Sequence, residues 1–106
     1  MNTLKTDFYL PDTKASKFPS EEKFGLTNQI RRSAVSVPSN IGEGAARKSK
    51  KDFSRFLYIS LGSLAELETQ MEISRRLNFI SEIKETGESV VYIRRMLLKL
   101  IKSLEE

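Results

Sequence analysis

The most regular feature of the chain is a set of apolar or small residues that recur every three or four positions. The first such stretch runs from residue 21 to 47 and contains Thr27, Ile30, Ala34, Val37, Ile41 and Ala45. The same spacing returns over about 50 to 76 and over 88 to 105. Because this period matches the 3.6 residues of a helical turn, it predicts three amphipathic helices over these ranges. No strand-type alternation competes over a useful length.

Helix-capping and helix-weakening residues refine these ranges. Ser20 and Ser49 are plausible N-caps, and Asp52 stands three residues after Ser49, as in a capping box. Pro38 lies inside the first range and predicts a kink there, because proline removes a backbone hydrogen bond. Gly42 and Gly44 follow it and predict either a close contact with a neighbouring helix or subunit, or the shaping of a ligand-binding surface.

The segment before residue 21 shows broken periodicity and holds Pro11 and Pro19, so it predicts a short or irregular first helix over residues 1–20. Short connections favour antiparallel packing of successive helices. We therefore expect an all-α protein in one domain over residues 1–106, an antiparallel up-down bundle of the four-helix type with its second helix kinked near Pro38. Gly62, with Ser63 and Ala65, favours the close approach of another backbone to the longest helix; the alternative is that Gly62 only lowers helix propensity, by about 1 kcal/mol relative to alanine.

Composition limits the chemistry that the chain can perform. The 106 residues contain neither Cys nor His, which removes disulfides, the thiol nucleophile, the commonest general base and the usual nitrogen and sulfur metal ligands. No phosphate-binding loop of the Gly-x4-Gly-Lys-Ser/Thr type occurs. We expect a protein that is not an enzyme and uses no cofactor or metal. The absence of Cys fits the cytoplasm, and no segment reaches membrane-spanning length without charges.

Positive charge is concentrated in one stretch of the chain. The sequence holds 18 Lys and Arg against 14 Asp and Glu, a net charge of +4, and between residues 31 and 55 the acidic residues are just Glu43 and Asp52. Clustered cations neutralise phosphates of RNA or DNA with little base specificity. The alternative is a solvated, Lys-rich loop. The predicted nucleic-acid contacts are Arg31, Arg32, Arg47, Lys48, Lys50 and Lys51.

Polar residues on the first two predicted long helices allow a hydrogen-bonded network between them. Side chains one helical turn apart share a face, and buried polar groups need partners. We expect this network to be structural, although carboxylate chemistry at Glu43 or Glu66 is a competing hypothesis. Its predicted members are Asn40, Glu43, Arg55, Ser63 and Glu66.

Two long motifs carry a resemblance to a known family. "FPSEEKFGLTNQIRRSAVSVPSNIGEG" and "RFLYISLGSLAELE", within residues 18–80, resemble the four-helix-bundle bacterial proteins encoded in intervening sequences of 23S ribosomal RNA genes. This resemblance implies assembly as a homopentamer. It also implies a relationship to the accessory variability protein of diversity-generating retroelements, a basic pentameric barrel that associates with reverse transcriptase and nucleic acid.

The residues and the resemblance together predict a non-enzymatic, oligomeric helical bundle that binds RNA or DNA non-specifically through a basic surface. The alternative function is that of a protein-protein adaptor that docks on an enzyme such as a reverse transcriptase. No membrane partner is expected.

Overall fold

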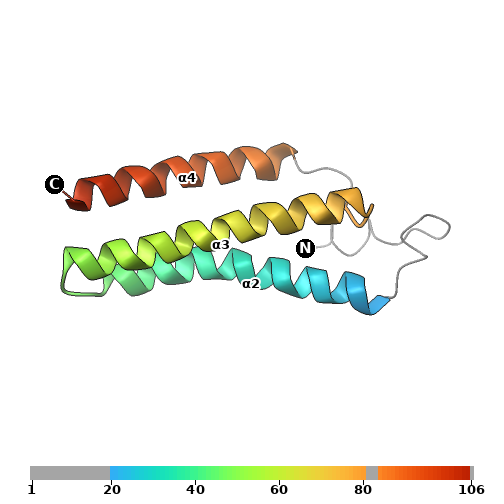
Figure 1. The fold of residues 1–106 in the computed structure, drawn as a ribbon, viewed down its shortest axis with the longest axis horizontal. Helices are drawn as coiled ribbons and strands as arrows, with labels where there is room; N and C mark the ends of the chain where they lie inside the picture. The colour runs from blue at the N-terminus through green and yellow to red at the C-terminus, as the bar shows by residue number, and fades with distance from the viewer. Residues whose placement is uncertain (1–19, 81–83, 106) are drawn as a thin grey trace.

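The computed structural model describes residues 20–80 and 84–105, which form three long α-helices (Figure 1). These are α2 (Ser20–Ala45), α3 (Lys50–Arg76) and α4 (Lys84–Glu105). The described residues contain no strand, so the predicted all-α class is confirmed. Successive helices run in opposite directions, and the C-terminus of α4 therefore lies at the same end of the molecule as the connection between α2 and α3 (Figure 1).

The expected four-helix bundle is wrong, because the described residues form three helices. The fourth helix was expected from the family resemblance and from residues 1–20, whose apolar spacing is broken. Residues 1–19 lie outside the described residues. Ser20, expected as the N-cap of the next helix, is the first residue of α2.

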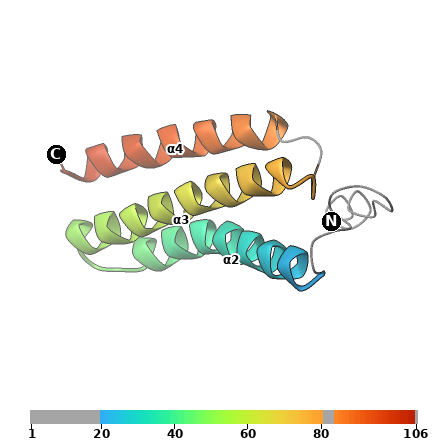
Figure 2. The same cartoon turned by 45° about the vertical axis from the view of Figure 1, so that its right-hand side comes forward.

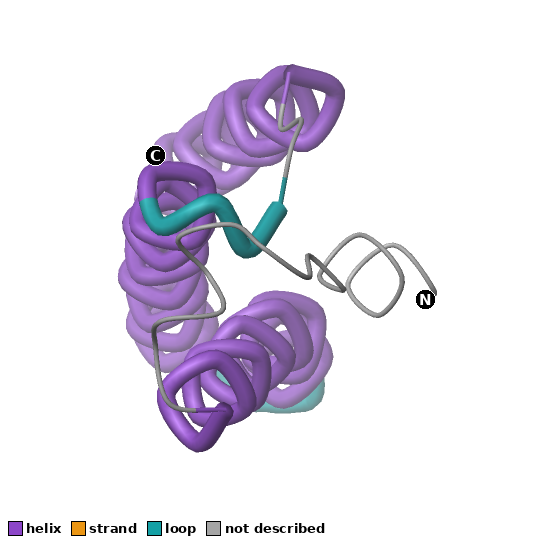
Figure 3. The backbone as a smooth tube through the Cα atoms, turned by 90° about the vertical axis from the view of Figure 1, so that its right-hand side faces the viewer, coloured by secondary structure: helices purple, strands orange, loops and turns teal. Residues whose placement is uncertain are grey.

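The three helices lie in a curved row with α3 in the middle, as the view along their axes shows (Figure 3). α3 packs against α2 on one side and against α4 on the other, and direct contacts between α2 and α4 are sparse. Leu57 and Leu64 of α3, which are almost completely buried, stand two turns apart at the centre of the core. The core cluster is made of Val37 from α2, Leu57 and Leu64 from α3, and Val90, Leu97 and Ile101 from α4.

The face between α2 and α3 is lined by small polar side chains. The Ser36 and Ser63 hydroxyl oxygens lie 2.7 Å apart, and the buried Ser60 hydroxyl donates to the Val37 carbonyl over 2.8 Å. Ser33 donates to the Gln70 side-chain carbonyl over 2.9 Å. Because hydrogen bonds are directional, these contacts fix how α2 and α3 are aligned along their axes. Every buried side-chain nitrogen and oxygen of the described residues has a partner.

Pro38 occupies the exposed side of α2. Pro38 has no N–H to donate to the Ala34 carbonyl, and its ring crowds that carbonyl. Because Ala34 is exposed, water can reach the carbonyl instead. Figure 2 shows α2 curving in its middle. The helix therefore continues through the proline instead of ending there.

Three helix ends differ from the expected ranges, and the smallest difference is at the start of α2, which begins at Ser20 and not at residue 21. α2 ends at Ala45, so Arg47 and Lys48 belong to the connection, whereas the expected range ended at residue 47. α4 begins at Lys84, four residues before the expected start, and carries Gly87 in its first turns. α3 ends at Arg76, and Asn78 follows with a φ of 64°, a conformation that asparagine tolerates better than most residues.

Two glycines that seemed equivalent in the sequence have different surroundings. A Cβ atom on Gly44 would lie 2.7 Å from the Phe56 Cβ and 3.0 Å from the Phe53 Cδ1, so glycine is what allows the end of α2 to reach the start of α3. A Cβ on Gly62 would meet nothing within 4 Å. The close approach expected at Gly62 is therefore absent from the described fold, whereas the close contact expected at Gly42 and Gly44 as one of two alternatives is found at Gly44.

Candidate nucleic-acid interface

One end of the molecule is built from the α2–α3 connection, the first turns of α3 and the last turn of α4 (Figure 1). The Ser49 hydroxyl accepts a hydrogen bond from the Asp52 backbone N–H over 3.1 Å and caps α3. The connection itself is held by the Arg47 backbone N–H, which donates to the Gly44 carbonyl over 3.0 Å. This short, hydrogen-bonded connection places the cations on both sides of Ser49 at the tip of the molecule.

The structure brings four of the six predicted nucleic-acid contacts together at this tip. Arg47, Lys48, Lys50 and Lys51 are all exposed there. Arg31 and Arg32 are exposed too, but they lie near the middle of α2, and the thirteen residues that follow Arg32 up to Ala45 span roughly 20 Å of helix axis. The predicted set is therefore two separate groups, of which the one at the tip is larger.

Two arginines flank one aromatic ring beside the tip. The guanidinium carbons of Arg47 and Arg55 lie 4.8 and 4.6 Å from the centroid of the Phe56 ring. Arg47 also pairs with Glu43 over 2.7 Å, and Arg55 lies 3.9 Å from Asp52. Cation–π contacts at such exposed sites contribute about 0.5–1 kcal/mol each, which favours one orientation of these side chains.

Lys48, Lys50 and Lys51 differ from these arginines because no described carboxylate forms an ion pair with them. Their charges are accordingly available to an outside anion. Lys102, in the last turn of α4, is a further exposed cation on the helix whose end reaches the tip. We call Arg47, Lys48, Lys50 and Lys51 the basic end.

Sequence reasoning missed the contribution of the last turn of α4 to this end of the molecule. Leu104 and Glu105 stand more than fifty positions from Lys50 and Lys51 in the chain, and all four line one cleft because α4 runs antiparallel to α3. The helical periodicity and the short connection between α3 and α4 are the signals that could have indicated this proximity.

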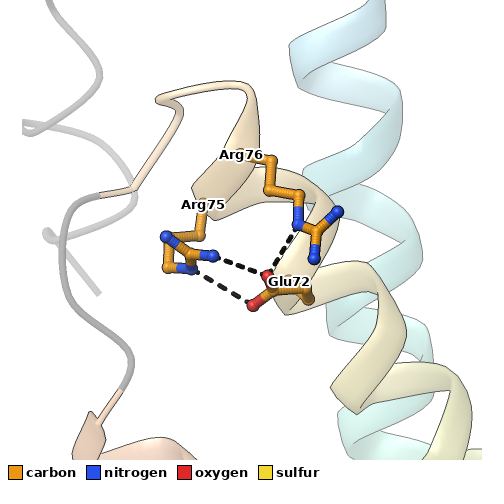
Figure 4. A network of polar contacts seen from close by, with 3 residues as sticks. All are labelled: Glu72, Arg75 and Arg76. Atoms are coloured by element: carbon orange, nitrogen blue, oxygen red, sulfur yellow. Dashed lines mark hydrogen bonds and ion pairs between the residues drawn. The ribbon is translucent and has the colours of Figure 1, made fainter.

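At the opposite end of α3, two arginines pair with one carboxylate (Figure 4). Glu72 accepts hydrogen bonds from Arg75 over 2.6 Å and from Arg76 over 2.8 Å. These hydrogen bonds lower the pKa of the Glu72 carboxyl to about 2, and the same pairing raises the pKa of Arg75. Both arginines at that end therefore have a carboxylate partner, in contrast to Lys48, Lys50 and Lys51 at the tip.

The five residues predicted to form one polar network do not do so in the described structure. The Asn40 amide donates to the Ser36 hydroxyl over 3.0 Å, and Ser36 in turn contacts Ser63, so Asn40 and Ser63 are linked through a residue that the prediction omitted. The other three predicted members are exposed. Glu43 pairs with Arg47, Arg55 lies near Asp52, and Glu66 forms no ion pair with a described residue.

Neither a metal cluster nor a membrane span is found in the described ranges. No group of three or more Asp and Glu side chains among residues 20–80 and 84–105 is placed to hold a metal ion. None of the three described helices combines the length and apolar character that a membrane crossing requires. That the chain is not an enzyme stays a prediction.

Fold and site together define the class of this chain: an all-α protein of long antiparallel helices with cations gathered at one tip. Comparison with protein families refines the class. Residues 8–99 match the family described as 23S rRNA-intervening sequence protein, and because this match covers most of the chain, the protein belongs to that family. No curated protein sequence matches the chain.

Proposed function

We propose that this family member is a non-enzymatic, oligomeric protein that binds RNA or DNA non-specifically through its basic end. The observation that supports the proposal most strongly is the presence of Lys48, Lys50 and Lys51 at one tip, exposed and without described ion-pair partners. A phosphate backbone supplies regularly spaced negative charges that such lysines can neutralise. The absence of Cys supports the cytoplasm as the place where this happens.

The expected binding is sensitive to salt and insensitive to base sequence. Each phosphate neutralised by a lysine releases condensed counterions, so the logarithm of the affinity falls with the logarithm of salt concentration by about 0.7 to 0.9 per contact. Lysine contacts to phosphates carry no base information. Neutralising a pair of lysines that each contact a phosphate should therefore reduce this slope by about 1.4 to 1.8.

The test compares two charge-matched variants. Lys50→Ala/Lys51→Ala removes two cations from the basic end, and Arg31→Ala/Arg32→Ala removes two adjacent exposed cations from the middle of α2. Fluorescence anisotropy with a labelled RNA at about 50 and about 200 mM salt should show weaker binding and a smaller slope for the lysine pair. An equal loss of affinity in both variants would mean that binding depends on net charge alone. An unchanged affinity in the lysine variant would show that the assigned site is wrong.

We further propose that the chain assembles with copies of itself, and the family resemblance favours five. The support is apolar surface on α4, where Val91, Tyr92, Met96 and Leu98 are between 42% and 65% exposed. Such side chains on one helix are typical of a surface that is covered by another protein. Assembly would also repeat the basic end around a ring and strengthen weak phosphate contacts through multivalency.

Light scattering after size exclusion tests the assembly. The wild type should run as a particle several times the monomer mass, and Tyr92→Ser/Met96→Ser should lower that mass. Val35→Ser is the control, because Val35 is a comparably exposed apolar residue on a different helix, α2. A monomeric wild type would contradict the proposal.

The adaptor function is the second candidate, and the same apolar surface of α4 favours it. A protein partner such as a reverse transcriptase would cover Tyr92 and Met96 in place of another copy of the chain. This candidate predicts that a partner protein remains bound after nuclease treatment, whereas a partner held through nucleic acid would be released.

A further inference from the structure

An open cleft of about 890 Å³ lies within the tip, between the start of α3 and the end of α4. Lys50, Lys51 and Arg55 line it from α3, and Leu104 and Glu105 line it from the last turn of α4. The cleft exists because α4 is antiparallel to α3 and ends beside its first turns (Figure 1). Part of the positive charge of the tip therefore borders a concave surface.

Tyr58 adds an aromatic ring to this cleft. The residue is 53% exposed, and it forms no hydrogen bond or ring contact with a described residue. It stands two helical turns from Lys51 and one turn from Arg55, which places the three on the same side of α3. Leu104 provides an apolar wall on the α4 side. The cleft thus combines an exposed aromatic ring, an apolar side chain and nearby cations.

The cleft has a net positive charge although two acidic residues line it. Asp52 lies 3.9 Å from Arg55, and it is in the first turn of α3, where the helix dipole also favours a carboxylate. Glu105 is the second carboxylate, against three cations. An anionic ligand is therefore favoured on the Lys50 and Lys51 side, away from the Glu105 side.

We infer that this cleft binds an unpaired nucleotide of a single-stranded RNA or DNA, with its base stacked on Tyr58 and its phosphates on Lys50 and Lys51. This inference rests on the proposed nucleic-acid binding and specifies its ligand. Stacking on an aromatic side chain accepts any base, because every base has a π face. The site therefore keeps the low sequence specificity of phosphate binding and adds a requirement for unpaired bases.

A requirement for unpaired bases distinguishes this site from a purely electrostatic surface. The bases of a duplex are stacked on one another and cannot reach Tyr58, whereas a duplex carries more phosphate charge per unit length than a single strand. An electrostatic surface would bind the duplex at least as tightly. The cleft predicts the opposite order, with the single strand bound more tightly than the duplex.

The experiment uses three labelled probes of about 12 nucleotides: an oligodeoxyadenylate, an abasic strand of equal length, and the oligodeoxyadenylate annealed to its complement. The abasic strand keeps the phosphates and lacks every base. Free AMP is added as a competitor, to show whether a single nucleotide suffices or a strand is needed. The wild-type chain should bind the oligodeoxyadenylate about 5- to 100-fold more tightly than the abasic strand.

The variants separate stacking from charge. Tyr58→Ala should lose that 5- to 100-fold advantage and bind the abasic strand as the wild type does, and Tyr58→Phe should keep the advantage because the ring remains. Phe24→Ala is the matched control, since Phe24 is an aromatic residue with 66% exposure at the other end of the molecule. Lys50→Ala/Lys51→Ala should weaken the binding of all three probes. Circular dichroism verifies that each variant remains helical.

The outcomes distinguish the inference from the proposed function. If the three probes bind equally in a manner that depends on Lys50 and Lys51, the proposed function stands and the stacking site is overturned. Unchanged binding of the oligodeoxyadenylate by Tyr58→Ala also overturns it. If the wild type binds none of the probes at low salt, the proposed function fails and the inference fails with it.

Discussion

Replacement of Gly44 by alanine should destabilise the protein, although alanine is the better helix former. Gly44 lies in the last turn of α2, against the start of α3. The added Cβ would lie 2.7 Å from the Phe56 Cβ and 3.2 Å from the Phe53 backbone oxygen. Neither of these atoms can move away through a change of side-chain rotamer, so the ends of α2 and α3 would have to separate.

Two opposing effects determine how much Gly44→Ala changes the free energy of unfolding. Alanine gains up to about 1 kcal/mol over glycine in a helix, and overpacking of this kind costs about 1–3 kcal/mol. Because backbone must shift to relieve the contact, we expect the cost to fall near the upper value and the net loss of stability to be about 1–2 kcal/mol. In a domain of this size such a loss lowers the Tm by roughly 5–15 °C.

Gly42→Ala is the matched control for this experiment. Gly42 is in the same turn of α2, it is exposed, and a Cβ there meets nothing within 4 Å. This variant should therefore gain about 0.5–1 kcal/mol. Urea denaturation followed by circular dichroism, at one fixed protein concentration, measures both free energies of unfolding. The reasoning is refuted if Gly44→Ala is as stable as the wild type or more stable.

Three further predictions concern the hydrogen bonds of the fold. Ser60→Ala removes the donor to the Val37 carbonyl and should cost about 1 kcal/mol in the free energy of unfolding, and an unchanged free energy would contradict its role between α2 and α3. Ser49→Ala removes the cap of α3 and should also cost about 1 kcal/mol, whereas Ser39→Ala, on the exposed side of α2, should change little. Glu72 has a folded-state pKa of about 2, below its usual 4.5, so its contribution to stability is complete above pH 4.5 and is lost as the pH falls toward 2. An NMR titration of the Glu72 carboxyl checks this, and a midpoint near 4.5 would contradict the pairing with its two arginines.

The sequence was sufficient for the all-α class because its apolar positions follow the helical period through most of the chain. It was insufficient for the number of helices, since the fourth depended on the family resemblance and on residues 1–20, where that period is broken. The pattern predicted a close contact at Gly44 as one of two alternatives, and it wrongly predicted another at Gly62. Gly44 and Gly62 are both small residues in helices, and the difference between them depends on which side of each helix faces its neighbour.

The candidate site was predicted in part, for a related reason. Arg47, Lys48, Lys50 and Lys51 are close together in the sequence and stay close because a short connection joins their helices. Proximity in the sequence misleads for Arg31 and Arg32, because a rigid helix carries them away from the tip. The sequence does not show directly that the end of α4 lies near the start of α3. The two meet because α4 runs antiparallel to α3 (Figure 1).

The central claim is that nucleic acid binds at the tip where α3 begins and α4 ends, and an amide NMR titration with a short single-stranded RNA tests it most directly. We predict that the amide signals of residues 47–58 and 102–105 shift at low salt and return toward their free positions at high salt, while those around Arg31 and Arg32 stay in place. Shifts centred on the middle of α2, or no shifts at low salt, would contradict the account.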